Sequence, residues 1–260
     1  MKQNEKNIAF NAKDLKGSRL RCMMFTNLPD ERIADHLTNL VQPYATVRPD
    51  DVWMPRGFQK PDEARMGESK SFLSAKQRET ITAWWLKKRG RANTPNWDIA
   101  STCVIGGCKG IVLVEAKAHE NEFQVTGDNC GSENKENRIK IKSAISEANA
   151  GLNGDGQTRF SGWSLSEKGS YQLSNRFAWS WKIASLGVPV ILIYLGFLNA
   201  WEMKKDGDRI LTSTKHWQDY VTESAKQIVP PEAWGKRLVI GSTSFIPLIR
   251  ALDVNVSVSN

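Results

Sequence analysis

The feature that most constrains the fold of this chain is a pair of apolar segments joined by two glycines and ending in charged residues. Residues 98–117 read DIASTCVIGGCKGIVLVEAK, with the density of β-branched side chains that is typical of buried strands. A Gly-Gly pair between two such segments indicates a tight β-hairpin. We therefore predict two antiparallel strands, with Asp98 at the start of the first and Glu115 and Lys117 at the end of the second.

The length of the hairpin loop decides how these charged residues meet. A two-residue loop pairs Asp98 with Glu115, whereas a four-residue loop pairs Asp98 with Lys117. Because side chains alternate along a strand, both registers bring the three charges onto one face of the sheet. A three-residue loop would turn Asp98 to the other face.

Two carboxylates on an apolar hairpin repel each other unless a cation lies between them. Mg²⁺ and Mn²⁺ prefer oxygen ligands, so Asp98 and Glu115 are candidate metal ligands. Lys117 would then orient or deprotonate a water molecule, or stabilise the charge of a phosphate. The alternative is a solvent-exposed salt bridge at a strand end, which contributes little to stability.

The E-x-K spacing is not specific by itself. Residues 60–70, KPDEARMGESK, even place Pro61-Asp62 ahead of Glu68 and Lys70, but no apolar strand is present, and we interpret this stretch as a loop. Among the E-x-K sites, only Glu115 and Lys117 stand at the end of an apolar strand. Only there does the preceding predicted strand begin with an acid, Asp98. The other glutamates with this spacing are Glu133 and Glu202.

The remaining periodic segments predict an α/β or α+β protein with a central mixed sheet flanked by helices. Residues 1–74 are interpreted as an N-terminal elaboration, with Trp53 and Phe58 as candidate anchors, packed on a core of residues 75–260. Residues 188–198 form a central strand, and residues 237–249 are expected to add an edge strand. The predicted helices cover residues 30–41, 74–90, 132–152, 169–187 and 214–229.

The arrangement of Asp98 on one hairpin strand and Glu115-Ala116-Lys117 on the next resembles the PD-(D/E)xK nuclease superfamily, which has the restriction-endonuclease-like fold. The resemblance covers residues 75–200, and Trp97 stands where the motif has proline. It implies that Asp98, Glu115 and the backbone carbonyl of Ala116 bind Mg²⁺ or Mn²⁺. It also implies that Lys117 acts on the attacking water.

Two more site residues follow from the resemblance. The helix before the hairpin is expected to contribute a further acid, for which Glu79 is the candidate. A later helix is expected to carry a glutamine toward the site, for which Gln172 is the candidate. Gln172 and Arg176 share a helix face, which either decorates the surface or faces the site.

The resemblance implies a magnesium-dependent nuclease, a phosphodiesterase that hydrolyses DNA, or alternatively RNA, in restriction, repair or defence against mobile elements. A net charge of +8, from 36 basic and 28 acidic residues, favours a polyanionic partner. The competing interpretation is a catalytically inactive nucleic-acid-binding or assembly protein with the same fold. The sequence leaves the oligomeric state open, and a homodimer is suggested by family analogy alone. A separate target-reading domain does not fit in 260 residues, so a partner protein would have to supply that function.

Composition limits the protein class further. With 40% hydrophobic and 25% charged residues, the chain is typical of globular proteins. The first residues lack a secretory signal and no apolar segment is long enough to span a membrane, so we expect a cytoplasmic protein without membrane contact. The four cysteines lack zinc-site spacing and are expected to be reduced thiols.

Two kinds of side chain are candidates for contacts with nucleic acid. The basic runs at residues 87–91 and 138–142 are either solvated faces or phosphate contacts. Most of the ten tryptophans are expected in the core, and one or two are expected to stack on bases.

Overall fold

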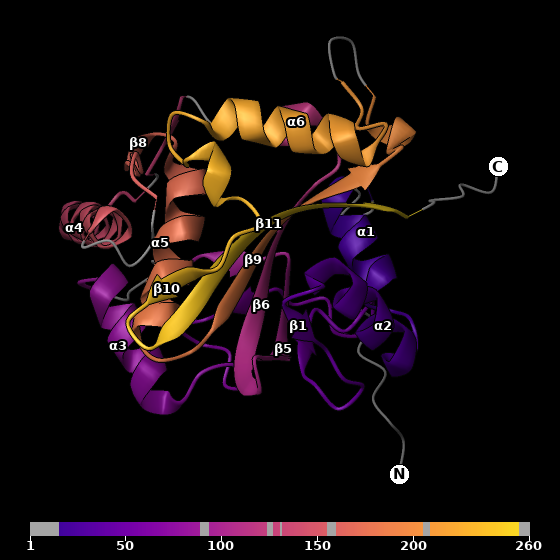
Figure 1. The fold of residues 1–260 in the computed structure, drawn as a ribbon, viewed down its shortest axis with the longest axis horizontal. Helices are drawn as coiled ribbons and strands as arrows, with labels where there is room; N and C mark the ends of the chain where they lie inside the picture. Colours follow the sequence, from indigo (N-terminus) through magenta and orange to yellow (C-terminus); the bar gives the residue numbers. More distant parts are fainter. Residues whose placement is uncertain are drawn as a thin grey trace.

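The computed structural model describes residues 16–88, 94–123, 127–130, 132–154, 160–204 and 209–254. A curled, mixed sheet with the strand order β1-β5-β6-β9-β11-β10 forms the centre of this α/β protein, and β2 also pairs with β5 (Figure 1). The strands of this sheet are β1 (Ala45–Thr46), β2 (Trp53–Met54), β5 (Ile99–Ile105), β6 (Cys108–Lys117), β9 (Val190–Leu198), β10 (Leu238–Ile240) and β11 (Thr243–Asp253).

Six α-helices among the described residues cover the sheet. In Figure 1 the indigo α1 and α2 lie to the right of the sheet, α3, α4 and α5 lie to its left, and α6 lies above. The helices are α1 (Gly17–Phe25), α2 (Asp30–Val41), α3 (Ala75–Trp85), α4 (Lys135–Asn153), α5 (Tyr171–Ser185) and α6 (Thr214–Ala225). Two small two-stranded sheets pair β3 (Ala64–Arg65) with β4 (Asn96–Trp97) and β7 (Asp128–Asn129) with β8 (Lys168–Gly169).

The hairpin of β5 and β6 adopts the two-residue register. Ile105 pairs with Cys108, and the intervening Gly106 and Gly107 have φ angles of 57° and 83°. Glycine adopts this left-handed conformation without a steric penalty, which explains the Gly-Gly sequence. The four-residue alternative is therefore wrong.

Alternation along β6 separates two apolar layers. Ile111 and Leu113 belong to the cluster that includes side chains of α3, α4, α5 and α6, whereas Val112 and Val114 belong to the cluster with α1 and α2. Glu115 and Lys117 continue the first series, so they point toward the α5 side of the sheet. The core thus determines the direction of the charged residues at the strand end.

Local signals account for several elements. Ser74 caps α3 by accepting a hydrogen bond from the Gln77 backbone N–H, and the Gln77 side chain completes the capping box. Helix α2 has the predicted bounds. Helix α3 ends at Trp85 rather than at Gly90, which lies outside the described residues.

The expectation of an edge strand near the C-terminus is corrected. Strand β11 pairs in parallel with β9 from Phe245 to Asp253 and is therefore internal, while the short β10 forms the edge. The apolar residues of β11 occupy both layers, with Phe245 in one cluster and Ile246 in the other. Burial on both faces is what a parallel internal strand requires.

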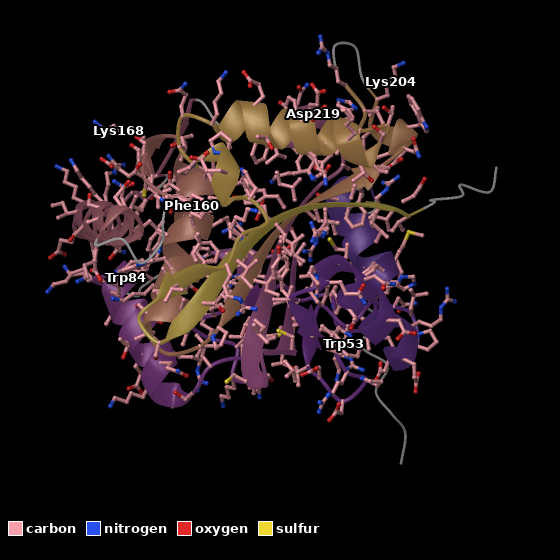
Figure 2. The ribbon with its side chains drawn as sticks, in the orientation of Figure 1. Trp53, Trp84, Phe160, Lys168, Lys204 and Asp219 are labelled. Carbon is pink, nitrogen blue, oxygen red and sulfur yellow. The ribbon has the colours of Figure 1, made fainter. Side chains whose placement is uncertain are left out.

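The N-terminal part of the described chain is closely integrated with the sheet. Strands β1 and β2 pair with β5, and Trp53 of β2 is fully buried between the sheet and its neighbours (Figure 2). Phe58 is only half-buried. No helix in the described ranges is long and apolar enough to cross a membrane.

Candidate active site

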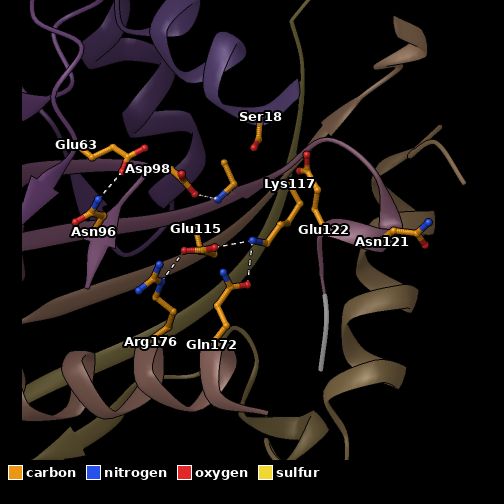
Figure 3. Close-up of a pocket in the computed structure, with 11 residues that line it drawn as sticks. Ser18, Glu63, Asn96, Asp98, Glu115, Lys117, Asn121, Glu122, Gln172 and Arg176 are labelled. Atoms are coloured by element: carbon orange, nitrogen blue, oxygen red, sulfur yellow. Dashed lines mark hydrogen bonds and ion pairs between the residues drawn. The ribbon is translucent and has the colours of Figure 1, made fainter. Parts of the chain in front are cut away.

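A pocket of about 410 Å³ lies at the end of the β5–β6 hairpin (Figure 3). Residues from α1, the β3–β4 pair, β6, the 3-10 helix η2 (Glu120–Glu122) and α5 meet there. The lining residues are Ser18, Glu63, Asn96, Asp98, Glu115, Ala116, Lys117, Asn121, Glu122, Gln172 and Arg176. Four of the five residues predicted to act in catalysis are in this list, together with Ala116.

Asp98 enters the pocket from a bend between β4 and β5. Its Oδ2 atom accepts a hydrogen bond of 2.7 Å from the backbone N–H of Ala116, the residue between Glu115 and Lys117. This bond ties the acid of the first hairpin segment directly to the E-x-K of the second. The three charged side chains predicted to meet therefore line one pocket.

Glu115 is held between two cations. Lys117 Nζ donates to Glu115 Oε1 at 2.6 Å, and Arg176 Nε donates to Glu115 Oε2 at 2.5 Å. Lys117 also donates to Oε1 of Gln172 at 3.1 Å. All three charged groups are buried, with 2% of Glu115, 6% of Lys117 and 8% of Arg176 exposed. The network is therefore shielded from bulk water. A buried ion pair is favourable only when its geometry is good and its remaining polar atoms are hydrogen-bonded.

Helix α5 supplies the second cation. Gln172 and Arg176 are four residues apart and so project from one face of the helix toward β6. The guanidinium of Arg176 also lies over the ring of the buried Trp97, 4.8 Å from its centroid. Trp97, at the position of the motif proline, therefore contributes a cation–π contact.

The pKa values of the two acids of the hairpin are shifted in opposite directions. Burial, followed by the negative charge of Glu115, raises the pKa of Asp98 from 3.8 to about 7, against the opposing effects of Lys117 and the Ala116 N–H. Burial would also raise the pKa of Glu115, but Arg176 and Lys117 outweigh it and lower that pKa from 4.5 to about 2. Burial disfavours the charged form of Lys117, yet Glu115 and Asp98 raise its pKa above 10.5. Opposite shifts in one pocket are characteristic of functional sites.

The expectation for Glu79 is corrected, because the structure does not bring it to the pocket. Its side chain is exposed on α3. The inward side of that helix carries Ile81, Trp84 and Trp85, all buried. Since Glu79 lies two residues before Ile81, a rotation of about 200° along the helix directs it to the opposite, solvated side.

Glu63 and Glu122 are the other acids of the pocket. Glu63 lies in residues 60–70, where the prediction of a loop is corrected in part, because Ala64–Arg65 form the short strand β3. It immediately precedes β3, whose pairing with β4 brings it beside Asn96, and its Oε2 accepts a 3.0 Å hydrogen bond from Asn96 Nδ2. Its Oε1 pairs with Arg19 of α1. Its only sequence signal was the Pro-Asp-Glu run ahead of Glu68. Ser18, Asn121 and Glu122 carried no signal at all.

The donor set fits a hard divalent cation bound through few protein ligands. Asp98 and Glu115 supply carboxylate oxygens, and Mg²⁺ is commonly bound by one or two carboxylates with water completing its shell. Within the described residues, no group of three His, Cys, Asp or Glu side chains is arranged to hold a metal ion. The Oδ1 atom of Asp98 accepts no hydrogen bond from these residues.

Several other expectations concern residues outside the pocket. In the described ranges Cys22, Cys103, Cys108 and Cys130 are all free thiols. Of the basic run at 87–91, residues 89–91 lie outside the described residues.

Comparisons with protein-family models, curated proteins and solved structures find no match for this chain.

Proposed function

We propose that this protein is a divalent-metal-dependent nuclease that hydrolyses phosphodiester bonds of DNA, with a core of the restriction-endonuclease type. The observation that carries the proposal is the convergence of Asp98, Glu115, Ala116 and Lys117 in one pocket, through a hydrogen bond from Ala116 N–H to Asp98 and an ion pair from Lys117 to Glu115. Restriction, repair and defence against mobile elements are all compatible with this chemistry.

Each side chain has a distinct role in the proposed reaction. Asp98, Glu115 and the Ala116 carbonyl would hold Mg²⁺ or Mn²⁺, which supplies a Lewis acid for the phosphate and lowers the pKa of a coordinated water. Arg176 keeps Glu115 ionised, because it donates to Oε2 from the side opposite to Lys117. Deprotonated ligands are required for metal binding.

Lys117 is the residue that handles the attacking water and the developing phosphate charge. Its ammonium shares its hydrogens between Glu115 and Gln172. Gln172 therefore retains Lys117 in the pocket when Glu115 takes up another cation. We further propose that Glu63, rather than Glu79, is the additional acid of the site.

Cleavage of supercoiled and linear DNA in Mg²⁺, with EDTA as the metal-free control, tests the proposal. Asp98→Ala and Lys117→Ala are expected to lower the cleavage rate by about 10² to 10⁴-fold, the typical contribution of such groups. Glu79→Ala is the matched control, since it removes an exposed acid outside the pocket and should cleave as wild type does. Equal cleavage by wild type, Asp98→Ala and Lys117→Ala would exclude this site.

One observation favours a second function, that of a catalytically inactive nucleic-acid-binding or assembly protein. Both oxygens of Glu115 are already paired, with Lys117 and with Arg176, so the charge of this carboxylate is compensated without a metal. This alternative predicts no heat of Mn²⁺ binding in calorimetry and no metal-dependent cleavage. Salt-dependent binding of DNA would remain.

A further inference from the structure

Trp201 is the most exposed aromatic side chain in the described part of the chain, with 55% of its surface accessible. The other nine tryptophans are buried or half-buried, as expected for core residues. More than half of this indole is exposed to water and gains nothing from burial in the free protein. A single exposed apolar residue is common, so its surroundings decide whether it can bind a ligand.

The 3-10 helix η3 (Trp201–Met203), which carries this tryptophan, packs against the rim of the pocket. Glu202 forms an ion pair with Arg21 of α1. A Cβ atom at Gly17 would lie 3.2 Å from Met203 Sδ and 3.3 Å from Glu122 Oε1, so these three residues meet at the start of α1. Glu122 lines the pocket, and so does Ser18, the residue after Gly17. Hence η3 lies next to residues that line the pocket.

Three exposed cations flank the segments next to the pocket. Lys204 follows η3, with Nζ 5.8 Å from the centroid of the Trp201 ring, and it lies at the surface in Figure 2. Lys16 precedes Gly17 at the start of α1. Arg209 accepts, through its carbonyl, a 3.1 Å hydrogen bond from the N–H of Glu120 in η2, the turn that lines the pocket. An exposed indole with a lysine beside it, and two further exposed cations, therefore lie on or next to segments that neighbour a pocket rich in carboxylates.

We propose that Trp201, Lys16, Lys204 and Arg209 form a docking surface for single-stranded nucleic acid. An unpaired base stacks on the Trp201 indole while the cations contact phosphates on either side, an arrangement that binds strands without reading their sequence. Bases in a duplex are stacked on one another and present no free face to the indole. This inference rests on the proposed nuclease function, which makes the pocket the point of cleavage, and it specifies a single strand or an unpaired end as the substrate.

Fluorescence anisotropy with labelled oligothymidylate in EDTA tests the surface without cleavage. Trp201→Ala should weaken binding about tenfold, within the range measured for loss of one base–aromatic stack, and Trp201→Phe should retain most of the affinity. Val239→Ala is the matched control for an exposed apolar residue, at 44% exposure on β10. Lys204→Ala should reduce affinity and its salt dependence, whereas Lys109→Ala, at the far end of β6, should not.

A strand of the same length that lacks bases separates stacking from a structural effect. Wild type and Trp201→Ala should bind this abasic strand equally. Equal affinity of the two proteins for oligothymidylate, or an equal loss by Trp201→Ala on both strands, would overturn the docking surface. Trp201-dependent binding without metal-dependent cleavage would reject only the nuclease proposal, and cleavage of single strands that is unaffected by Trp201→Ala would reject only the docking surface.

Discussion

Asp98→Asn should stabilise the metal-free protein at high pH, and the size of the effect follows from the pocket. The pKa of Asp98 rises from 3.8 to about 7 on folding, mainly through burial and then through the charge of Glu115. The unfolded chain loses the Asp98 proton at lower pH than the folded protein does. The free energy of unfolding therefore falls as pH rises from 3.8 to about 7 and stays low at higher pH. An asparagine removes this cost, and its side-chain oxygen can still accept the Ala116 N–H.

The magnitude can be estimated from linkage. A pKa that rises from 3.8 to about 7 corresponds to at most ~4 kcal/mol at about pH 8, since each unit represents about 1.4 kcal/mol. At about pH 5 the same linkage leaves ~2 kcal/mol. Asp98 keeps some solvent contact, so we expect about half of the difference. The advantage of Asp98→Asn over wild type should then grow by roughly 1–2 kcal/mol between these conditions.

Urea unfolding in EDTA near pH 5 and pH 8 measures this advantage. Asp51→Asn is the control, because Asp51 also accepts a backbone N–H, from Arg48 at 2.8 Å, but lies outside the pocket. It measures how the loss of a carboxylate outside the pocket changes stability under the two conditions. If Asp98→Asn is no more stable than wild type near pH 8, or if its advantage is independent of pH, Asp98 is not a buried carboxylate beside Glu115 and the proposed metal site loses its physical basis.

Three further predictions concern the same region. Mn²⁺ at 100 times its dissociation constant should stabilise wild type by about 2.7 kcal/mol in thermal or urea unfolding; an equal gain by Asp98→Ala would show binding elsewhere. Arg176→Ala should cost about 3–5 kcal/mol in urea unfolding, because it removes one of the two partners of the buried Glu115; a cost near zero would contradict the buried pair. Gly196→Ala should cost about 1–3 kcal/mol, since the new Cβ would lie 2.7 Å from the Trp217 ring; unchanged stability would contradict this packing.

Much of the candidate site could be predicted from the sequence because its central part is local. Asp98, Glu115 and Lys117 lie within one hairpin, so a Gly-Gly turn and a period of two determine that they share a face. The helix cap at Ser74 is likewise a short-range hydrogen bond within four residues. Such features depend on neighbouring residues only, and the amino-acid sequence contains them directly.

The tertiary structure alone decided which distant residues complete the pocket and how its acids titrate. Glu63 reaches the pocket through the pairing of β3 with β4, and Arg176 reaches it through the packing of α5 on the sheet. The opposite pKa shifts of Asp98 and Glu115 depend on burial and on two cations that form ion pairs with Glu115 but not with Asp98. No periodicity encodes these contacts, because they join segments that are far apart in the chain and come together only when the core forms. Tertiary packing also explains why Glu79 lies outside the pocket. The tryptophans on one side of α3 are buried against the core, and Glu79 projects from the opposite, exposed side.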